Sequence, residues 1–417
     1  MNQLKKIAAV GGAVCLVASW PLVVGQIAQS VFNDNIATIN NRLVSGKILT
    51  YDRGYFSSHV ETEIQVIDPG LKEQMQDDGF PTSWVFSTEV KHGLFSIDAM
   101  TRLKDHQDIP VQITTRTQLN GNTQFEMDSQ VIHYQGNAWS LSLTPASLSG
   151  SVTTLGEVDY QLDMPSVQFS DTDFQVKLDN IRGNGQGKKE KGFWVGSQTL
   201  QVEKAEMSDS ADLEQFTLEK VGYQNTSSLD ANRERYDTRQ QFNIANISAQ
   251  DGVIEHLNVI FSMGQLDADS LAEIARVVEH YTEMSQEDTQ DLQKALDQLV
   301  SKGFSMSLEQ LDIGLPQGQI ESKVDLKLPE ATEGMAQDPF AIVKKLTGHV
   351  ESHVPRTVAE AFPVLRQGVD ELVAMEMMKE SGDVYQMDAV VKDGNLVFDS
   401  GKEVPLTVLL MSLMMKM

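Results

Sequence analysis

A chain of 417 residues, 41% of them hydrophobic, is long enough for two or three domains and is expected to fold. Its 59 Asp and Glu against 33 Lys and Arg give a formal net charge of -26, which repels phosphate backbones and argues against nucleic-acid binding. The single cysteine, Cys15, excludes an intramolecular disulfide.

The N-terminal sequence predicts a membrane anchor. Lys5 and Lys6 precede an uncharged run that begins at Ile7 and ends at Ile27. As a helix, this run would span about 30 Å, the thickness of the hydrocarbon core of a bilayer. The leading lysines favour residues 1–6 as a cytoplasmic tail, residues 7–27 as a single-pass signal anchor, and a body outside the cytoplasm. A cleaved secretory signal and a lipoprotein signal at Cys15 stay open as alternatives.

A helical extension is predicted for residues 28–46. Val31, Ile36, Ile39 and Leu43 continue an apolar stripe at helical spacing after the anchor. This spacing predicts a helix that carries on from the membrane toward the body.

Residues 47–328 are predicted to be rich in strands. Val60, Thr62, Ile64 and Val66 alternate with polar residues, which is typical of a strand with one wet face. A hairpin is expected around Asn120-Gly121-Asn122, and further strands at 139–143, 158–164, 174–181, 193–202 and 216–221. The glycine-rich stretch 183–187, followed by lysines, is interpreted as an exposed turn. The predicted fold is mainly β (α+β), a long, curved antiparallel sheet or sandwich with a few amphipathic helices.

Helical spacing returns in two places. An insert of one or two amphipathic helices is expected at 267–303, and a C-terminal α+β unit at 329–417. The C-terminal unit is predicted to contain a strand near 345–354, a helix from 355 to about 380, a hairpin at 385–398 turning on Asp393-Gly394, and a terminal apolar helix too short to span a bilayer.

No catalytic motif emerges from the chain. His349, Glu351 and His353 form an H-x-E-x-H pattern, which on a helix would direct two imidazoles at one metal ion. The flanking Val350 and Val354 equally suit a strand, and the pattern is not that of zinc peptidases. The expectation is therefore no enzyme, no cofactor and no metal site.

Three segments resemble the YdgA-like family of bacterial envelope proteins. They are Tyr51-Asp52-Arg53-Gly54-Tyr55-Phe56-Ser57-Ser58, then Val90-Lys91-His92-Gly93-Leu94-Phe95, and Asp393-Gly394-Asn395-Leu396-Val397-Phe398. The resemblance implies a mainly β protein of the periplasm, anchored in the bacterial inner membrane, in a family without an assigned molecular function. It supplies no catalytic residues.

The first two segments provide the candidate motif residues. We prefer a structural role for these residues. The first segment would form a strand bend or bulge, in which Arg53 would donate hydrogen bonds to turn carbonyls or pair with a buried carboxylate. His92-Gly93 is interpreted as a strand kink, and ligand contact stays the alternative. The residues are Tyr51, Arg53, Gly54, Phe56, Ser57, Ser58, His92, Gly93 and Phe95.

Two functions are compatible with these features. In the first, the sheet, which has one face exposed to water, curls around a lipid or an outer-membrane component and binds or chaperones it. In the second, the body is an interaction scaffold for envelope proteins or for a second copy of the chain in a homodimer, and it uses the helical segments 267–300 and 355–380.

Overall fold

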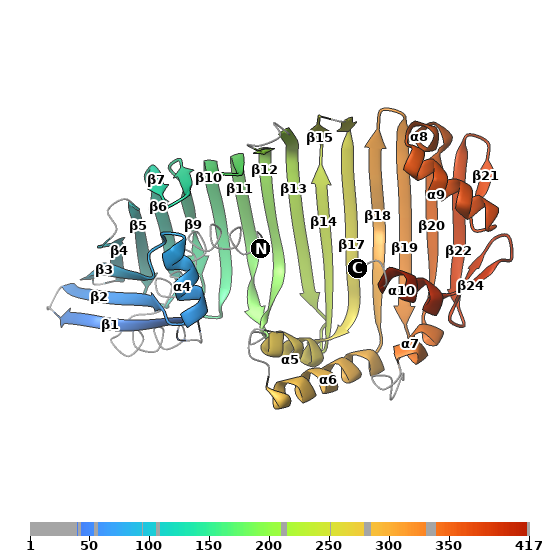
Figure 1. Ribbon diagram of the computed structural model, residues 1–417. Helices are drawn as coiled ribbons and strands as arrows, with labels where there is room; N and C mark the ends of the chain where they lie inside the picture. The colour runs from blue at the N-terminus through green and yellow to red at the C-terminus, as the bar shows by residue number, and fades with distance from the viewer. Residues whose placement is uncertain are drawn as a thin grey trace. The chain divides into compact units, whose positions relative to one another are not determined.

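The computed structural model describes residue 40 and residues 43–53, 57–93, 95–105, 109–209, 215–250, 252–278, 285–330 and 339–414. These residues form 24 strands and seven helices, and every strand pairing described is antiparallel (Figure 1). The predicted mainly β class is confirmed. The chain divides into two compact units, the first made of residues 1–186 and 201–215, the second of 187–200 and 216–417.

The first unit is built on one antiparallel sheet. Its strands follow the chain from β1 to β6, then β9 pairs with both β6 and β10. The second half of β10 pairs with β8, and β8 with β7. The strands are β1 Val44–Arg53, β2 Ser57–Val66, β3 Ser83–His92, β4 Ser96–Leu103, β5 Val111–Gln118, β6 Thr123–Ser129, β7 Ile132–Gln135, β8 Trp139–Leu143, β9 Ser147–Val152 and β10 Glu157–Asp171.

Helix α4, Pro69–Asp77, covers part of this sheet. Asp68 caps it by accepting a hydrogen bond from the backbone of Leu71, and Pro69 occupies a first-turn position where no N–H is needed. Met75 is buried against the inward residues of β2 and β3, which are Ile64, Val66, Trp84 and Phe86. The period-2 pattern read from the sequence therefore does mark a core face, with the helix as its cover.

The glycine-rich stretch 183–187 is not a turn, and that prediction was wrong. It lies inside β11, Phe174–Glu190, which forms a hairpin with β12, Phe193–Asp209. In the first unit, a Cβ on Gly185 would lie 2.5 Å from the ring of Tyr160. In the second unit, a Cβ on Gly187 would meet the backbone carbonyl oxygen of Val195 first, and would lie 2.8 Å from the ring of Trp194. These glycines leave space for aromatic rings, a packing role that composition does not reveal.

The second unit is also built on one antiparallel sheet, so neither unit contains two packed sheets. The main ladder runs β13, β14, β17, β18, β19, β20, β22, β23, β24. The strands are β13 Gln215–Leu229, β14 Arg235–Ile244, β15 Asn246–Ala249, β16 Gly252–Ile254, β17 His256–Asp267, β18 Phe304–Leu315, β19 Gly318–Leu328, β20 Thr347–Pro355, β21 Lys379–Ser381, β22 Val384–Lys392, β23 Asn395–Phe398 and β24 Glu403–Pro405.

Six helices complete the second unit. The predicted insert is confirmed as α5, Ala268–Val278, and α6, Gln286–Ser301. The helix expected at 355–380 is two helices, because Pro363 restricts Phe362 to extended backbone, and residues 379–381 form β21. The remaining helices are α7 Pro339–Lys345, α8 Arg356–Ala361, α9 Pro363–Ala374 and α10 Leu406–Met414.

The predicted anchor 7–27 and most of the predicted extension 28–46 lie outside the described residues. The end of that extension differs from the prediction, because β1 begins at Val44 and residues 44–46 are therefore strand. Among the residues that the structure describes, no helix is long and apolar enough to cross a bilayer.

Candidate functional sites

An apolar strip crosses the middle of the sheet in the second unit. The register aligns Phe242 with Val259 and Val259 with Leu311, while Phe261 lies opposite Leu308. Alternation along β17, together with the bulge in β18 between Leu308 and Leu311, places all of these side chains on the same face. The strip, which we call the apolar strip, consists of Phe242, Val259, Phe261, Met263, Leu308 and Leu311.

Helices cover this face at one side of the strip. Val354 of β20 and Tyr385 of β22 are buried beneath α8 and α9, and Ile320 of β19 packs against the same cluster. Leu406 and Leu409 of α10 pack against the buried residues of β22 and β23, and so do Leu326 of β19 and Val350 of β20. Figure 1 shows these three helices against β19 to β22, and, among the described residues, shows no helix over the middle of β14 and β17.

The strip itself stays partly open to solvent. Phe242 retains 36% of its accessible surface, and the other five side chains are half-buried. A row of aromatic and aliphatic side chains at this exposure is the kind of surface that soluble proteins bury against a ligand or partner.

The opposite face of the same strands is polar. Arg239 of β14 aligns with Ser262 of β17, which aligns with Ser307 of β18. The Ser307 hydroxyl donates to a carboxylate oxygen of Asp325, and Asp325 aligns with His349 on β20. Apart from the buried Ile260 on this face, and Gln240 and Thr238 on the face of the strip, the two faces differ in chemistry over the same strands.

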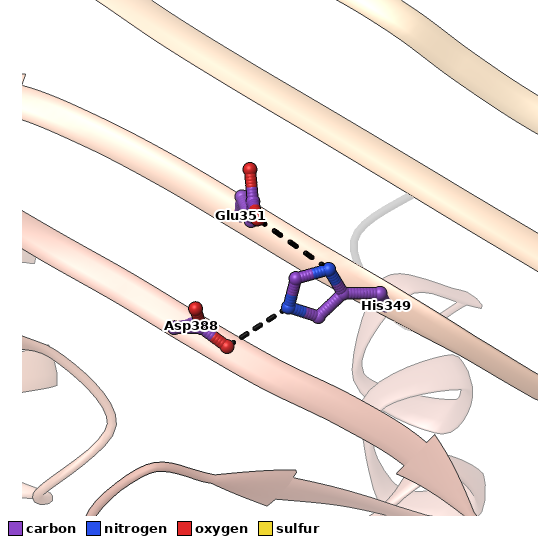
Figure 2. A group of neighbouring side chains, drawn as sticks. All are labelled: His349, Glu351 and Asp388. Carbon is purple, nitrogen blue, oxygen red and sulfur yellow. Dashed lines mark hydrogen bonds and ion pairs between the residues drawn. The ribbon is translucent and has the colours of Figure 1, made fainter.

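His349 lies on this polar face between two carboxylates (Figure 2). Its Nε2 is 2.9 Å from an oxygen of Asp388 on the neighbouring strand, and its Nδ1 is 3.5 Å from an oxygen of Glu351 on its own strand. The hydrogen bond to Asp388 raises the pKa of His349, burial opposes the rise, and the negative charges of Asp388, Glu351 and Asp325 add to it.

Three side chains in this cluster have atoms of the kind that bind divalent cations. One atom each from His349, Glu351 and Asp388 lies within 4.8 Å of the others. An imidazole, however, offers one nitrogen to a given metal ion, and here the two carboxylates approach opposite nitrogens of the ring. This arrangement suits an imidazolium held by two ion pairs. A cation would require the ring to turn.

The segment with the H-x-E-x-H pattern is a strand, which was one of its two sequence interpretations, and not the helix that a two-histidine metal site would need. The segment is β20, so His349, Glu351 and His353 share one face but spread along it. His353 aligns with Gln386, and Asp388 takes the place beside His349 that a second histidine would have on a helix. Asp388 is 39 positions from His349, and only the register of β20 and β22 brings it there, so no local signal in the sequence indicates it.

The motif residues of the first unit lie at one end of its sheet. Tyr51 and Arg53 lie on β1, just after a β-bulge between Ile48 and Thr50, while Gly54 and Phe56 lie outside the described residues. Arg53 is exposed, which argues against a buried carboxylate partner. Ser57 and Ser58 begin β2, and Ser58 is buried at 4% exposure.

The second motif segment is a hairpin connection. β3 ends at His92, and β4 begins at Ser96. A Cβ on Gly93 would lie 2.5 Å from the carbonyl oxygen of Ser96, so only glycine fits the close approach at this turn. Phe95 is 76% exposed and is not part of the core. Both motif segments thus shape the same end of the sheet.

Comparison of the chain with curated proteins and with solved structures finds no match. A family model does match, and it extends over residues 4–407, which include both units and the N-terminal apolar run. The chain therefore belongs to the family described as bacterial proteins of unknown function, DUF945.

Proposed function

We propose that this chain is a cell-envelope protein that binds the acyl chains of a lipid on the apolar strip of its second unit. Residues 7–27 would anchor it in the inner membrane, with the body in the periplasm, where it would hold or chaperone a lipid or a lipid-bearing envelope component. The observation that supports this most is the contrast between the two faces of β14, β17 and β18.

The chemistry of the strip fits an acyl chain. Its side chains are Phe, Val, Met and Leu, and the strip continues from strand to strand. Methionine at position 263 adds an adaptable thioether of the kind that tolerates ligands of varied shape. A lipid covering these side chains would remove apolar surface from water, which is the main driving force for such binding.

The strip can be tested by photocrosslinking. The full chain is placed in vesicles that contain a fatty acid with a diazirine near the end of its acyl chain. After irradiation, labelled peptides are identified by mass spectrometry. The proposal expects labels on β17 and β18, and expects Phe261→Asn to reduce them strongly.

The neighbouring residue supplies the matched control. Ser262→Asn changes the polar face one position along the same strand, and should leave the labelling unchanged. Labels confined to residues 7–27, or equal loss in both variants, would refute lipid binding at the strip. Native mass spectrometry of the full chain adds a second reading, since lipid-free dimers would favour the interaction scaffold instead.

A further inference from the structure

Three hairpin tips at one end of the first unit carry exposed apolar residues. Phe95 lies between β3 and β4, Leu119 between β5 and β6, and Leu155 between β9 and β10. Their exposures are 76%, 78% and 78%, among the highest of the large apolar residues that the structure describes. None of the three is needed for the core, and each projects from a turn.

The strand register places these tips side by side. Phe95 and Leu119 each lie one residue beyond an aligned pair, Ser96 on β4 and Gln118 on β5. The β5–β6 and β9–β10 turns are neighbours because Thr123 aligns with Val152. The side-chain oxygen of Asn122 accepts a hydrogen bond from the backbone of Thr154 at 3.3 Å, which joins these two turns directly.

Cationic side chains lie at the same end. Arg53 is the last residue of β1 and aligns with Ser58, and Lys91 of β3 aligns with Ser57. Both cations are exposed. These two cations would meet the phosphate layer that borders a hydrocarbon phase, beside the exposed carboxylates of Asp52 and Glu157 at the same end.

We infer that this row of tips, Phe95, Leu119 and Leu155, is an edge that docks on the surface of a lipid bilayer. Separate projecting tips enter a fluid apolar phase without complementary pockets, whereas a protein partner would need one for each tip. The chain outside the described residues points to the same occupant. It contains the uncharged run 7–27 and joins this unit directly at β1.

β1 begins at Val44, at the opposite end of the strand from the tips, and extends about 33 Å over its ten residues. The docking edge and the apolar strip lie in different units. An experiment can therefore refute membrane docking without refuting lipid binding at the strip, and the reverse.

Two threonines provide matched positions for a probe. Thr154 is exposed in the β9–β10 turn, at the docking edge, and Thr172 is exposed in the β10–β11 turn. β10 separates these turns by about 50 Å. Thr154→Cys and Thr172→Cys, each in a Cys15→Ser full chain, are labelled with an environment-sensitive fluorophore and placed in phosphatidylcholine vesicles containing spin-labelled lipid.

Docking predicts quenching by spin-labelled lipid at residue 154 and little at residue 172. Replacing the three tips with serine should reduce quenching at residue 154 to the level at residue 172, and since all three are exposed, the fold should persist. Equal quenching at both positions, or quenching at 154 that survives the triple replacement, would overturn the inference. A blue shift at 154 without lipid quenching would indicate a second copy of the chain on the tips and would equally overturn it.

Discussion

The indole Nε1 of Trp139 donates a hydrogen bond to the backbone carbonyl of Asp78 at 2.6 Å. Asp78 is the residue that ends α4, where the last carbonyls of a helix lack partners within the helix. The side chains of Asn137 and Tyr134 donate to the flanking carbonyls of Asp77 and Gly79. The β7–β8 hairpin therefore satisfies three successive carbonyls and fixes the end of α4.

Trp139→Phe tests this anchor. The ring would still stack on Phe80, whose centroid is 4.2 Å away, but a carbonyl near the core would lose its donor. Such a loss costs about 1–3 kcal/mol. Hydrogen exchange should report easier opening of α4. Asn137→Ala removes an exposed donor to the neighbouring carbonyl and should have a smaller effect, so equal effects would contradict the special role of Trp139.

Gly185→Ala should destabilise the first unit. The added Cβ would meet the Tyr160 ring at 2.5 Å, and overpacking of this kind costs about 1–3 kcal/mol. Urea unfolding measures the change in the free energy of unfolding, and hydrogen exchange in β10 and β11 shows where the structure is weakened.

The control for this prediction is a double-mutant cycle. In a Tyr160→Ala background the space is vacant, and Gly185→Ala should cost less than it does in the natural chain. If the two substitutions change the free energy of unfolding additively, the space left by Gly185 is not what accommodates the Tyr160 ring.

The sequence predicted regular features well where the signal is local. Asp393 and Gly394 both have positive φ, at 52° and 78°, as a two-residue hairpin turn requires, and the hairpin forms there as expected. Similarly, Gly121 at φ 85° supports the predicted hairpin between β5 and β6.

Signals that depend on distant partners were missed. β14 contains Gln240 and Gln241 side by side and few apolar residues, so its alternation is weak, and it forms because the ladders on both sides hold it. The stretch 183–187 was misread because its glycines adjoin rings from other strands. For the same reason Asp388 could not be paired with His349 in advance.

The pKa of His349 should fall when Asp388 is made neutral. The hydrogen bond to Asp388 is the largest cause of the raised pKa, so Asp388→Asn should lower the pKa more than Glu351→Gln does. Histidine C–H resonances followed through a pH titration give both values. A larger drop in the Glu351→Gln variant would contradict the assignment.

The same ion pairs make local stability depend on pH. Because the pKa of His349 is raised in the fold, its contribution is fully present below the unfolded value of about 6.5. It is lost as pH rises through the folded pKa. Hydrogen exchange in β20 and β22 should therefore show weaker protection above that pKa, and this pH dependence should be absent from a His349→Gln variant.

Arg235 should be the most sensitive cation of the second unit. Its guanidinium donates to the carbonyls of Gln265, Lys302 and Gly303 at 2.8, 2.9 and 3.2 Å, and its side chain is only 15% exposed. Lys302 ends α6, so Arg235 satisfies the helix end and joins it to β14 and β17. The fork shape of the guanidinium is needed, because an ammonium cannot reach three carbonyls in one plane.

Arg235→Lys should therefore cost about 1–3 kcal/mol even though the charge is kept. The readout is hydrogen exchange in the last turn of α6 and the first residues of β18. Glu330 also contacts the guanidinium, at 2.6 Å, but is 75% exposed on its side chain, so Glu330→Ala should change little because solvent weakens such a pair. If Glu330→Ala loosens α6 as much as Arg235→Lys does, the ion pair and not the carbonyl contacts would be what holds the helix end to the sheet.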